Sequence, residues 1–472
     1  MVGASLVLLL LLPHDDKSPA KLPLGKETTH VTGPLDKDGY IDYEAALNDR
    51  LGKGITPETN ASVLLWKAIG PSPDGDAVPD GFFKRLGIDR PPEKGDYFIG
   101  LIVYLKEHAR LDRQEFRAID DQQGEAVRRL WAAKDYPHLA AWLRANEKPL
   151  AVIVEATRRP DYYNPLVTRN TPRGRTGLAA ARIPAAQQCR EVARALAARA
   201  MLRAGEGKFG EAWQDLLACH RLGRLVARGG TLVEPLIGYG IEQLAKDADL
   251  AYLDRAGLTA EQARACLKDL RDLPAVPGLD DKFDLTERFT YLDSVQLVHR
   301  YGLKALRDRA FEPPAEPGPK ELKALAGIDW EPTLRYGNRL FDRTAAALRM
   351  DDRPKRVKEL ERIWAEIVVH RNEAMPDDEP RGGILGGLLG GKRLGPERDQ
   401  KLAHALVSLL FPWAEKVQDA KERAGQVGRN LCVAFALAAY RADHGRYPAK
   451  LDELAPKYLA AVPDDLFSGK PL

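Results

Sequence analysis

Apolar residues recur at every third or fourth position through most of this chain, a period that predicts amphipathic helices. The clearest run covers residues 189–228. Its first half places small or apolar residues at Ala193, Ala197, Met201 and Ala204, and its second half places them at Ala212, Leu216, Cys219, Gly223 and Val226. The glycine-rich segment 205–210 separates the halves as a turn. Because two helices joined by a short loop pack antiparallel, the pattern predicts a helical hairpin.

The same period predicts further helices at residues 123–157, 236–253, 259–270, 285–309, 320–349 and 357–372. Residues 96–108 form the most strand-like run, and an amphipathic helix fits them nearly as well. We therefore expect a mainly α fold: a multi-helix bundle or array of antiparallel hairpins, with a long C-terminal helix and a short extended tail.

The long C-terminal helix is predicted from a change of character within one helical run. Residues 414–430 are polar and helix-compatible, whereas residues 431–440 are all apolar. Since a helix that is apolar on every side is a buried helix, we expect its last three turns to be fully buried. Gly445 is the expected C-cap, Pro448 prevents continuation, and a short helical turn is expected at 450–454.

Interruptions of the pattern divide the chain into regions. Residues 1–12 are apolar, too short to span a bilayer and not preceded by Lys or Arg, so we expect a truncated export signal or short anchor, with a buried apolar tail as the alternative. The expected regions after it are a linker at 13–35, an N-terminal helical region at 36–150, a central helical domain at 151–375 that contains the hairpin, a glycine-rich hinge at 376–398, and a C-terminal region at 399–472.

Composition excludes several classes of protein. The 472 residues are 44% hydrophobic and 29% charged, which is globular, and the net charge of +3 argues against a dedicated nucleic-acid binder. A mean hydropathy of −0.36 excludes a polytopic membrane protein. Four cysteines exclude a disulfide scaffold. Cys189 and Cys219 are offset by ~9 Å along the hairpin, beyond disulfide reach, so both are expected to be buried free thiols.

Three motifs imitate reactive sites without completing them. Residues 36–42 resemble a calcium loop, but Pro34 and Ala45 occupy the positions of the strongest ligands, so an Asp-Gly turn is expected. Residues 386–392 resemble a phosphate-binding loop, but Arg393 replaces its hydroxyl residue. Charged residues on the hairpin imitate an acid–base set, and their spacing predicts an exposed, ordinarily paired face: Glu206, Glu211, Asp215 and His220. We therefore predict no catalytic, metal or cofactor site.

Basic and aromatic residues are densest between Glu155 and Pro165, and the arginine-bearing loop that follows has no acid between Asp161 and Glu191. Such a cluster forms either a recognition surface for an anionic or peptide ligand or a structural corner where aromatic side chains cover a helix end, and the corner is favoured. The candidate interaction surface comprises Arg158, Arg159, Tyr162, Tyr163, Arg173 and Arg175.

Two segments resemble known families. Residues 439–454, read as AYRADHGRYP followed by two spaced leucines, and then residues 458–469, resemble the segment after the long helix of type II secretion pseudopilins. Leu466 stands where that family has Pro, the family's apolar N-terminal helix is absent, and the chain stops before its strands and metal-binding loop. The resemblance therefore implies a helix–turn–extended module and no pilus subunit.

The hairpin resembles one tetratricopeptide unit, with Leu196, Ala200, Ala212, Leu216 and Cys219 on its small or apolar positions. Arg199 and Arg203 depart from that pattern, and Lys246 stands where a following repeat needs a small residue. One hairpin, and no array, is expected. The bulk of the chain also resembles uncharacterised helix-rich bacterial proteins that carry the same tail.

Together these features predict a non-catalytic helical scaffold or adaptor of the bacterial cell envelope, periplasmic or membrane-anchored, with a cytoplasmic location as the alternative. We expect a protein partner, no nucleic acid, no cofactor, and peripheral or N-terminal membrane association. One alternative is an accessory component of a type II secretion-like or pilus-like assembly. Another is an enzyme whose site is assembled from residues distant in sequence.

Overall fold

The computed structural model describes residues 21–73, 75, 78–171, 174–302, 304–307, 325–374 and 395–472. This described part is mainly helical and ends in one long helix and a short tail, which confirms the predicted fold class. Its only paired strands within that part are β1 (Asn170–Thr171) and β2 (Gly174–Arg175), which form a minimal antiparallel hairpin. None of the described helices combines the length and apolar content that crossing a bilayer requires.

The predicted hairpin is present as α8 (Ala186–Gly205) and α9 (Phe209–Ala227). The two helices are antiparallel: the thiol of Cys219 lies 3.8 Å from the carbonyl oxygen of Ala193, and Asp215 pairs with Arg199 one turn further toward the loop. Cys189 and Cys219 are both buried and free, as predicted.

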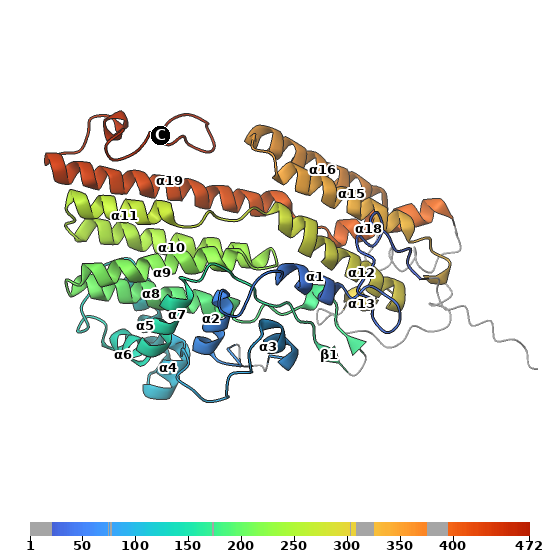
Figure 1. Cartoon of the computed structure of the whole chain (residues 1–472), viewed down its shortest axis with the longest axis horizontal. Coiled ribbons are helices and arrows are strands. Elements are labelled where there is room, and N and C mark those ends of the chain that lie inside the picture. Colours follow the sequence, from blue (N-terminus) through green and yellow to red (C-terminus); the bar gives the residue numbers. More distant parts are fainter. Residues whose placement is uncertain are drawn as a thin grey trace, which may run out of the picture.

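A stack of long helices extends from this hairpin. Helices α10 (Val233–Arg255), α11 (Ala260–Asp272) and α19 (Ala414–His444) lie along α8 and α9 in successive layers (Figure 1). Local sequence sets where such helices begin, since the side chain of Thr259 accepts a hydrogen bond from the Gln262 amide in a capping box. Gly445 adopts a left-handed conformation and caps α19, as predicted.

The first apolar cluster lies within this stack and beneath it. Short helices cover the underside of α8 and α9 and contribute large side chains such as Trp66 and Trp142. These helices are α2 (Ala61–Ile69), α3 (Asp80–Leu86), α4 (Leu101–His108), α5 (Arg113–Ala126), α6 (Pro137–Ala145) and α7 (Glu147–Ala156). The strand-like run at 96–108 is thus helical from Leu101, in agreement with its amphipathic alternative.

The second apolar cluster lies toward the other end of the molecule, where Phe283, Phe289 and Phe341 are fully buried. A single π-helical turn, η2 (Lys282–Glu287), leads directly into α12 (Arg288–Tyr301). The other elements of this part are α1 (Tyr43–Leu51), η1 (Leu178–Ala180), α13 (Lys304–Arg307), α15 (Glu331–Leu348), α16 (Arg353–Ala374) and α18 (Pro396–Leu410).

Helix α19 joins the two clusters. Its 31 residues extend ~46 Å. Ala414 and Val417 pack into the second cluster, whereas Leu431 and Phe435 pack into the first. The chain after α19 turns back through η3 (Leu451–Leu454) and lies along the same helix (Figure 1).

Two predicted segments fall outside the described residues: the apolar stretch and start of the linker before residue 21, and most of the glycine-rich hinge, including the imitation phosphate loop at 386–392. Where the description resumes, Pro396 occupies the first turn of α18, so this helix starts inside the region predicted as hinge. Each apolar cluster also draws on more than one of the predicted regions.

Candidate functional site

A histidine between two carboxylates lies at the centre of the helix stack. His220 of α9 is 1% exposed, and its Nε2 atom lies 2.7 Å from Oδ2 of Asp249 on α10. Its Nδ1 atom lies 3.3 Å from Oε2 of Glu242, which is about two turns before Asp249 on the same face of α10. Both carboxylates are buried. A protonated imidazolium therefore hydrogen-bonds to Asp249 and forms an ion pair with Glu242.

Two further cations complete this charge network. Arg224 of α9 donates from Nε to Oε1 of Glu242 at 3.0 Å. Lys246 of α10 lies 3.6 Å from the same carboxylate and donates to the carbonyl oxygen of Ala424 at 2.7 Å. Because Ala424 belongs to α19, the network fixes the register of three helices, α9, α10 and α19.

The protonation states follow from burial and mutual charge. Burial opposes a charged imidazole, but Asp249 and Glu242 outweigh it and raise the pKa of His220 to about 9. Burial likewise opposes a charged Glu242, but His220 and the nearby cations outweigh it and lower its pKa to about 2. For Asp249 burial outweighs the charge of His220, and its pKa is raised. At neutral pH His220 is thus a cation and has no free proton-accepting nitrogen.

A second buried ionic group ties the hairpin together. Asp215 is 1% exposed and accepts from Arg199 Nε at 2.9 Å and Nη2 at 2.6 Å, and from Arg203 at 2.8 Å. The predicted exposed face is therefore wrong for Asp215 and His220, although Glu206 and Glu211 are exposed as expected. The reason is tertiary: α8 packs on the Asp215 side of α9 and α10 packs on the His220 side, so both side chains are covered although helical spacing alone assigns them to solvent.

A third group lies where the π-turn meets the start of α10. Lys282 donates to the carbonyl oxygen of Gly229, and Glu287 accepts from the amide of Leu232 at 3.3 Å. Burial lowers the pKa of Lys282 to about 8 and raises that of Glu287 to about 7. The wide turn directs Lys282 and Glu287 at the segment 229–232, so this group holds η2 against the start of α10.

These groups are arranged for packing. Each carboxylate or cation described above with a shifted pKa has an interaction partner within the chain. No group of three or more potential ligands that could hold a metal ion occurs among the described residues. The imitation calcium loop is an Asp-Gly turn, as predicted: Gly39 has φ +80°, and Arg300 pairs with Asp36 at 2.8 Å and Asp38 at 2.6 Å. Its carboxylates neutralise an arginine of α12.

An apolar groove opens at the far end of the same helices. It has a volume of about 800 Å³ and lies between the last turns of α10 and α19, with the 257–258 turn and Tyr447 at its end. Leu250 and Tyr447 on its rim are 49% and 55% exposed. The predicted full burial of residues 431–440 is wrong on this side of α19, because Ala434, Leu437 and Ala438 remain half-buried. Sequence alone marks these positions as apolar, but it does not indicate which of them lack a neighbour.

The tail holds the groove's end in place. The Tyr440 hydroxyl donates to Glu453 at 2.7 Å, and the Tyr458 hydroxyl donates to Asp443 at 2.6 Å. Further along, the Leu466 amide donates to Gln426 at 2.7 Å. Arg441 donates to the Tyr447 hydroxyl at 3.1 Å, so the exposed tyrosine is oriented by a helical residue. The groove wall is thus supported by the chain that follows α19.

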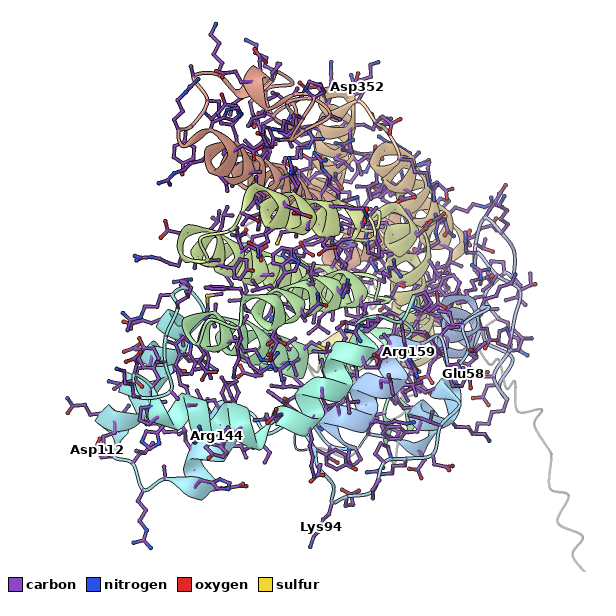
Figure 2. All side chains as sticks on the ribbon, turned by 60° about the vertical axis from the view of Figure 1, so that its left-hand side comes forward. Glu58, Lys94, Asp112, Arg144, Arg159 and Asp352 are labelled. Atoms are coloured by element: carbon purple, nitrogen blue, oxygen red, sulfur yellow. The ribbon has the colours of Figure 1, made fainter. Side chains whose placement is uncertain are left out.

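The predicted interaction surface lies elsewhere, where α7 ends. Arg159 donates to the carbonyl oxygens of Pro57 and Asn60 at 2.7 and 2.9 Å, next to Glu58, as the labels of Figure 2 show. Tyr163 is buried, and its hydroxyl donates to Asn48 at 3.1 Å.

The remaining members of that surface are less engaged or not described. Arg158 is exposed and pairs with Glu155 at 3.0 Å, and Tyr162 is half-buried against the first cluster. Arg173 lies outside the described residues, and of Arg175 only the backbone, in β2, is described. Arg159 and Tyr163 therefore make contacts within the chain, between the end of α7 and the segments around Asn48 and Asn60.

Comparison with family models, with curated proteins and with solved structures gave no match for this chain.

Proposed function

We propose that this protein is a non-catalytic helical scaffold that binds a protein partner in the groove between α10 and α19. The observation that carries the proposal is the outer face of α19. Residues 431–440 are apolar on every side, yet Ala434, Leu437 and Ala438 are only half-buried along an open groove. A helix of this kind is normally covered on all sides, so its open side is suited to a docked partner.

The buried charge networks support the same function. His220, Asp249 and Glu242 neutralise one another inside the stack, which makes the arrangement of α9, α10 and α19 specific. A scaffold requires a rigid surface, because a partner that docks on preformed helices loses less conformational entropy than one that must order them.

Site-specific photo-crosslinking in cells tests this function. A benzophenone amino acid replaces Tyr447, which lines the groove, and in a control it replaces Phe467, an aromatic of the same tail that is 45% exposed outside the groove lining. We expect a discrete crosslinked protein, identified by mass spectrometry, from position 447 only. Identical products from both positions, or none from position 447, would refute groove docking.

For the compartment we propose the bacterial cell envelope, supported by the apolar residues 1–12 and by the pseudopilin-like segment 439–469. Fractionation of cells with a tagged protein, combined with sequencing of its mature N-terminus, tests this: intact Met1 in the cytosol contradicts it. An accessory role in a type II secretion-like assembly is the narrower form of the proposal, and it fails if the crosslinked partners include no secretion component.

A further inference from the structure

The groove walls are two parallel helices with matching spacing. Lys246 of α10 contacts the α19 backbone at Ala424, and further along both helices Leu250 and Leu253 face the same groove as Ala434 and Leu437, so both chains run in one direction. The lining positions are 250, 253 and 254 on α10, 257 and 258 in the turn after it, and 434, 437, 438, 441 and 442 on α19. Steps of three and four place each set on one helical face. Two adjacent faces of this kind form the seat of a third helix.

The dimensions of the groove favour a helix over a globular partner. The lining of α19 extends over nine residues, from Ala434 to Ala442, and the eight helical steps between them measure ~12 Å or about two turns. A stable globular interface needs about 20–30 residues on each side, more than this groove supplies. A single amphipathic helix needs only its apolar stripe to be covered.

Charged residues on the two groove walls indicate which charges the bound helix would carry on its two sides. Asp254 lies on the α10 wall and Arg441 on the α19 wall. Both side chains are at the solvent edge, where Asp254 pairs only with the neighbouring Arg255, at 2.9 Å, among the interactions of the described residues. A helix seated between the walls therefore presents one flank to an acid and the opposite flank to a base.

We propose that the occupant of the groove is an amphipathic helix of the partner protein, with apolar residues spaced i, i+3, i+4, i+7, a basic residue on the flank facing α10 and an acidic residue on the flank facing α19. This inference rests on the proposed function and adds the chemistry of the partner to it. Small Ala434 and Ala438 allow the incoming helix to approach α19 closely, and Leu250 packs over it from the opposite wall.

Fluorescence anisotropy with designed peptides tests the occupant. The probes are a labelled helical peptide that carries leucines at this spacing with lysine and glutamate on opposite flanks, a peptide with the two flanks exchanged, and a scrambled peptide. We expect the wild-type chain to bind one flank arrangement most tightly and the scrambled peptide least. Leu250→Glu should weaken the preferred peptide at least about tenfold. Val233→Glu is the matched control, since Val233 is also on α10 and 51% exposed, and it should leave binding unchanged.

Exchange of the wall charges gives a second, independent readout. The double variant Asp254→Lys with Arg441→Glu should reverse the preference between the two flank arrangements, a result that misfolding cannot produce. Equal binding of the scrambled peptide, equal binding by Leu250→Glu, or an unreversed preference each overturns the inference. The inference is also overturned if the wild type sediments as a dimer and the Leu250→Glu variant sediments as a monomer, since the groove would then hold a second copy of this chain. Crosslinking at position 447 with no peptide binding would refute the helical occupant alone and leave groove docking in place.

Discussion

Helices α10 and α19 lie side by side along two stretches of contrasting character: an inner stretch of buried charged residues and an outer stretch of apolar residues at the groove. Along the inner stretch, Glu242, Lys246 and Asp249 are buried and each has an oppositely charged partner. Along the outer stretch, Leu250 and Leu437 are apolar and lie at an open groove. Buried charge is tolerated only with a partner in place, whereas apolar surface can stay exposed, and covering it lowers the free energy. The inner stretch therefore fixes the helices, and the outer stretch is left free to bind.

The largest expected effect is on the inner stretch. Glu242→Ala removes the anion shared by His220, Arg224 and Lys246 and leaves buried cations without compensation. We expect the free energy of unfolding to fall by about 3–5 kcal/mol, measured by urea denaturation followed by circular dichroism. Glu211→Ala, on the exposed face of α9, is the control and should change it by less than about 0.5 kcal/mol. Equal effects of the two variants would show that the network contributes nothing specific.

The second effect is a pH dependence that belongs to His220. Its folded-state pKa of about 9 lies above the ordinary 6.5, so the folded chain binds the proton more tightly and the stabilisation is complete below pH 6.5. It is lost as pH rises through 9, by on the order of 3 kcal/mol. The measurement is the difference in unfolding free energy between wild type and His220→Gln from pH 6 to pH 9.5, which cancels other titrating groups. A constant difference across this window contradicts the prediction.

The third effect tests how closely the helices of the inner stretch approach. A Cβ atom at Gly238 of α10 would overlap the Gly223 carbonyl oxygen and the Ala227 side chain of α9. Gly238→Ala should therefore lower the unfolding free energy by about 1–3 kcal/mol. On the same helix a Cβ at Gly240 meets no atom within 4 Å. Gly240→Ala should instead stabilise by up to about 1 kcal/mol, so thermal melting of the two variants should shift in opposite directions.

The smallest effect is expected at the groove. Leu250→Glu places a charge where the side chain is already 49% exposed, so the free energy of unfolding should change by less than about 0.5 kcal/mol even though peptide binding is weakened. Urea denaturation of this variant checks the prediction. A loss above about 2 kcal/mol would mean that the outer stretch is part of the folding core, and the contrast between the two stretches would disappear.

Local rules in the sequence correctly predicted the helices that depend on them. The spacing of Ala193, Ala212 and Cys219 predicted the hairpin, the helical period predicted a helix from residue 259 that matches α11, and Gly445 predicted the end of α19. These features depend on residues within a few turns of one another, and a linear pattern contains that information.

The candidate site was only partly accessible to the same rules. One wall of the groove includes residues from the segment 431–440, and the sequence correctly predicted that this segment is apolar. The prediction that it is completely buried was wrong, because a sequence pattern cannot show where a neighbouring helix ends. The charge network has a weak signal in the sequence: Glu242, Lys246 and Asp249 are spaced for one helical face and lie beside the buried Ala245 and Ala248. The sequence could not predict that Asp249 and Glu242 pair with His220, since this pairing depends on which face of α9 packs against α10.

The amino-acid sequence by itself thus determined that this protein is an array of helices, where its hairpin turns and that its C-terminal helix is long, because helix formation and capping are local. Only the tertiary structure decided that Asp215 and His220 are buried ions instead of surface charges, and that one side of an all-apolar helix stays open. Both outcomes depend on which helices pack side by side, and that choice is made by contacts between residues far apart in the chain.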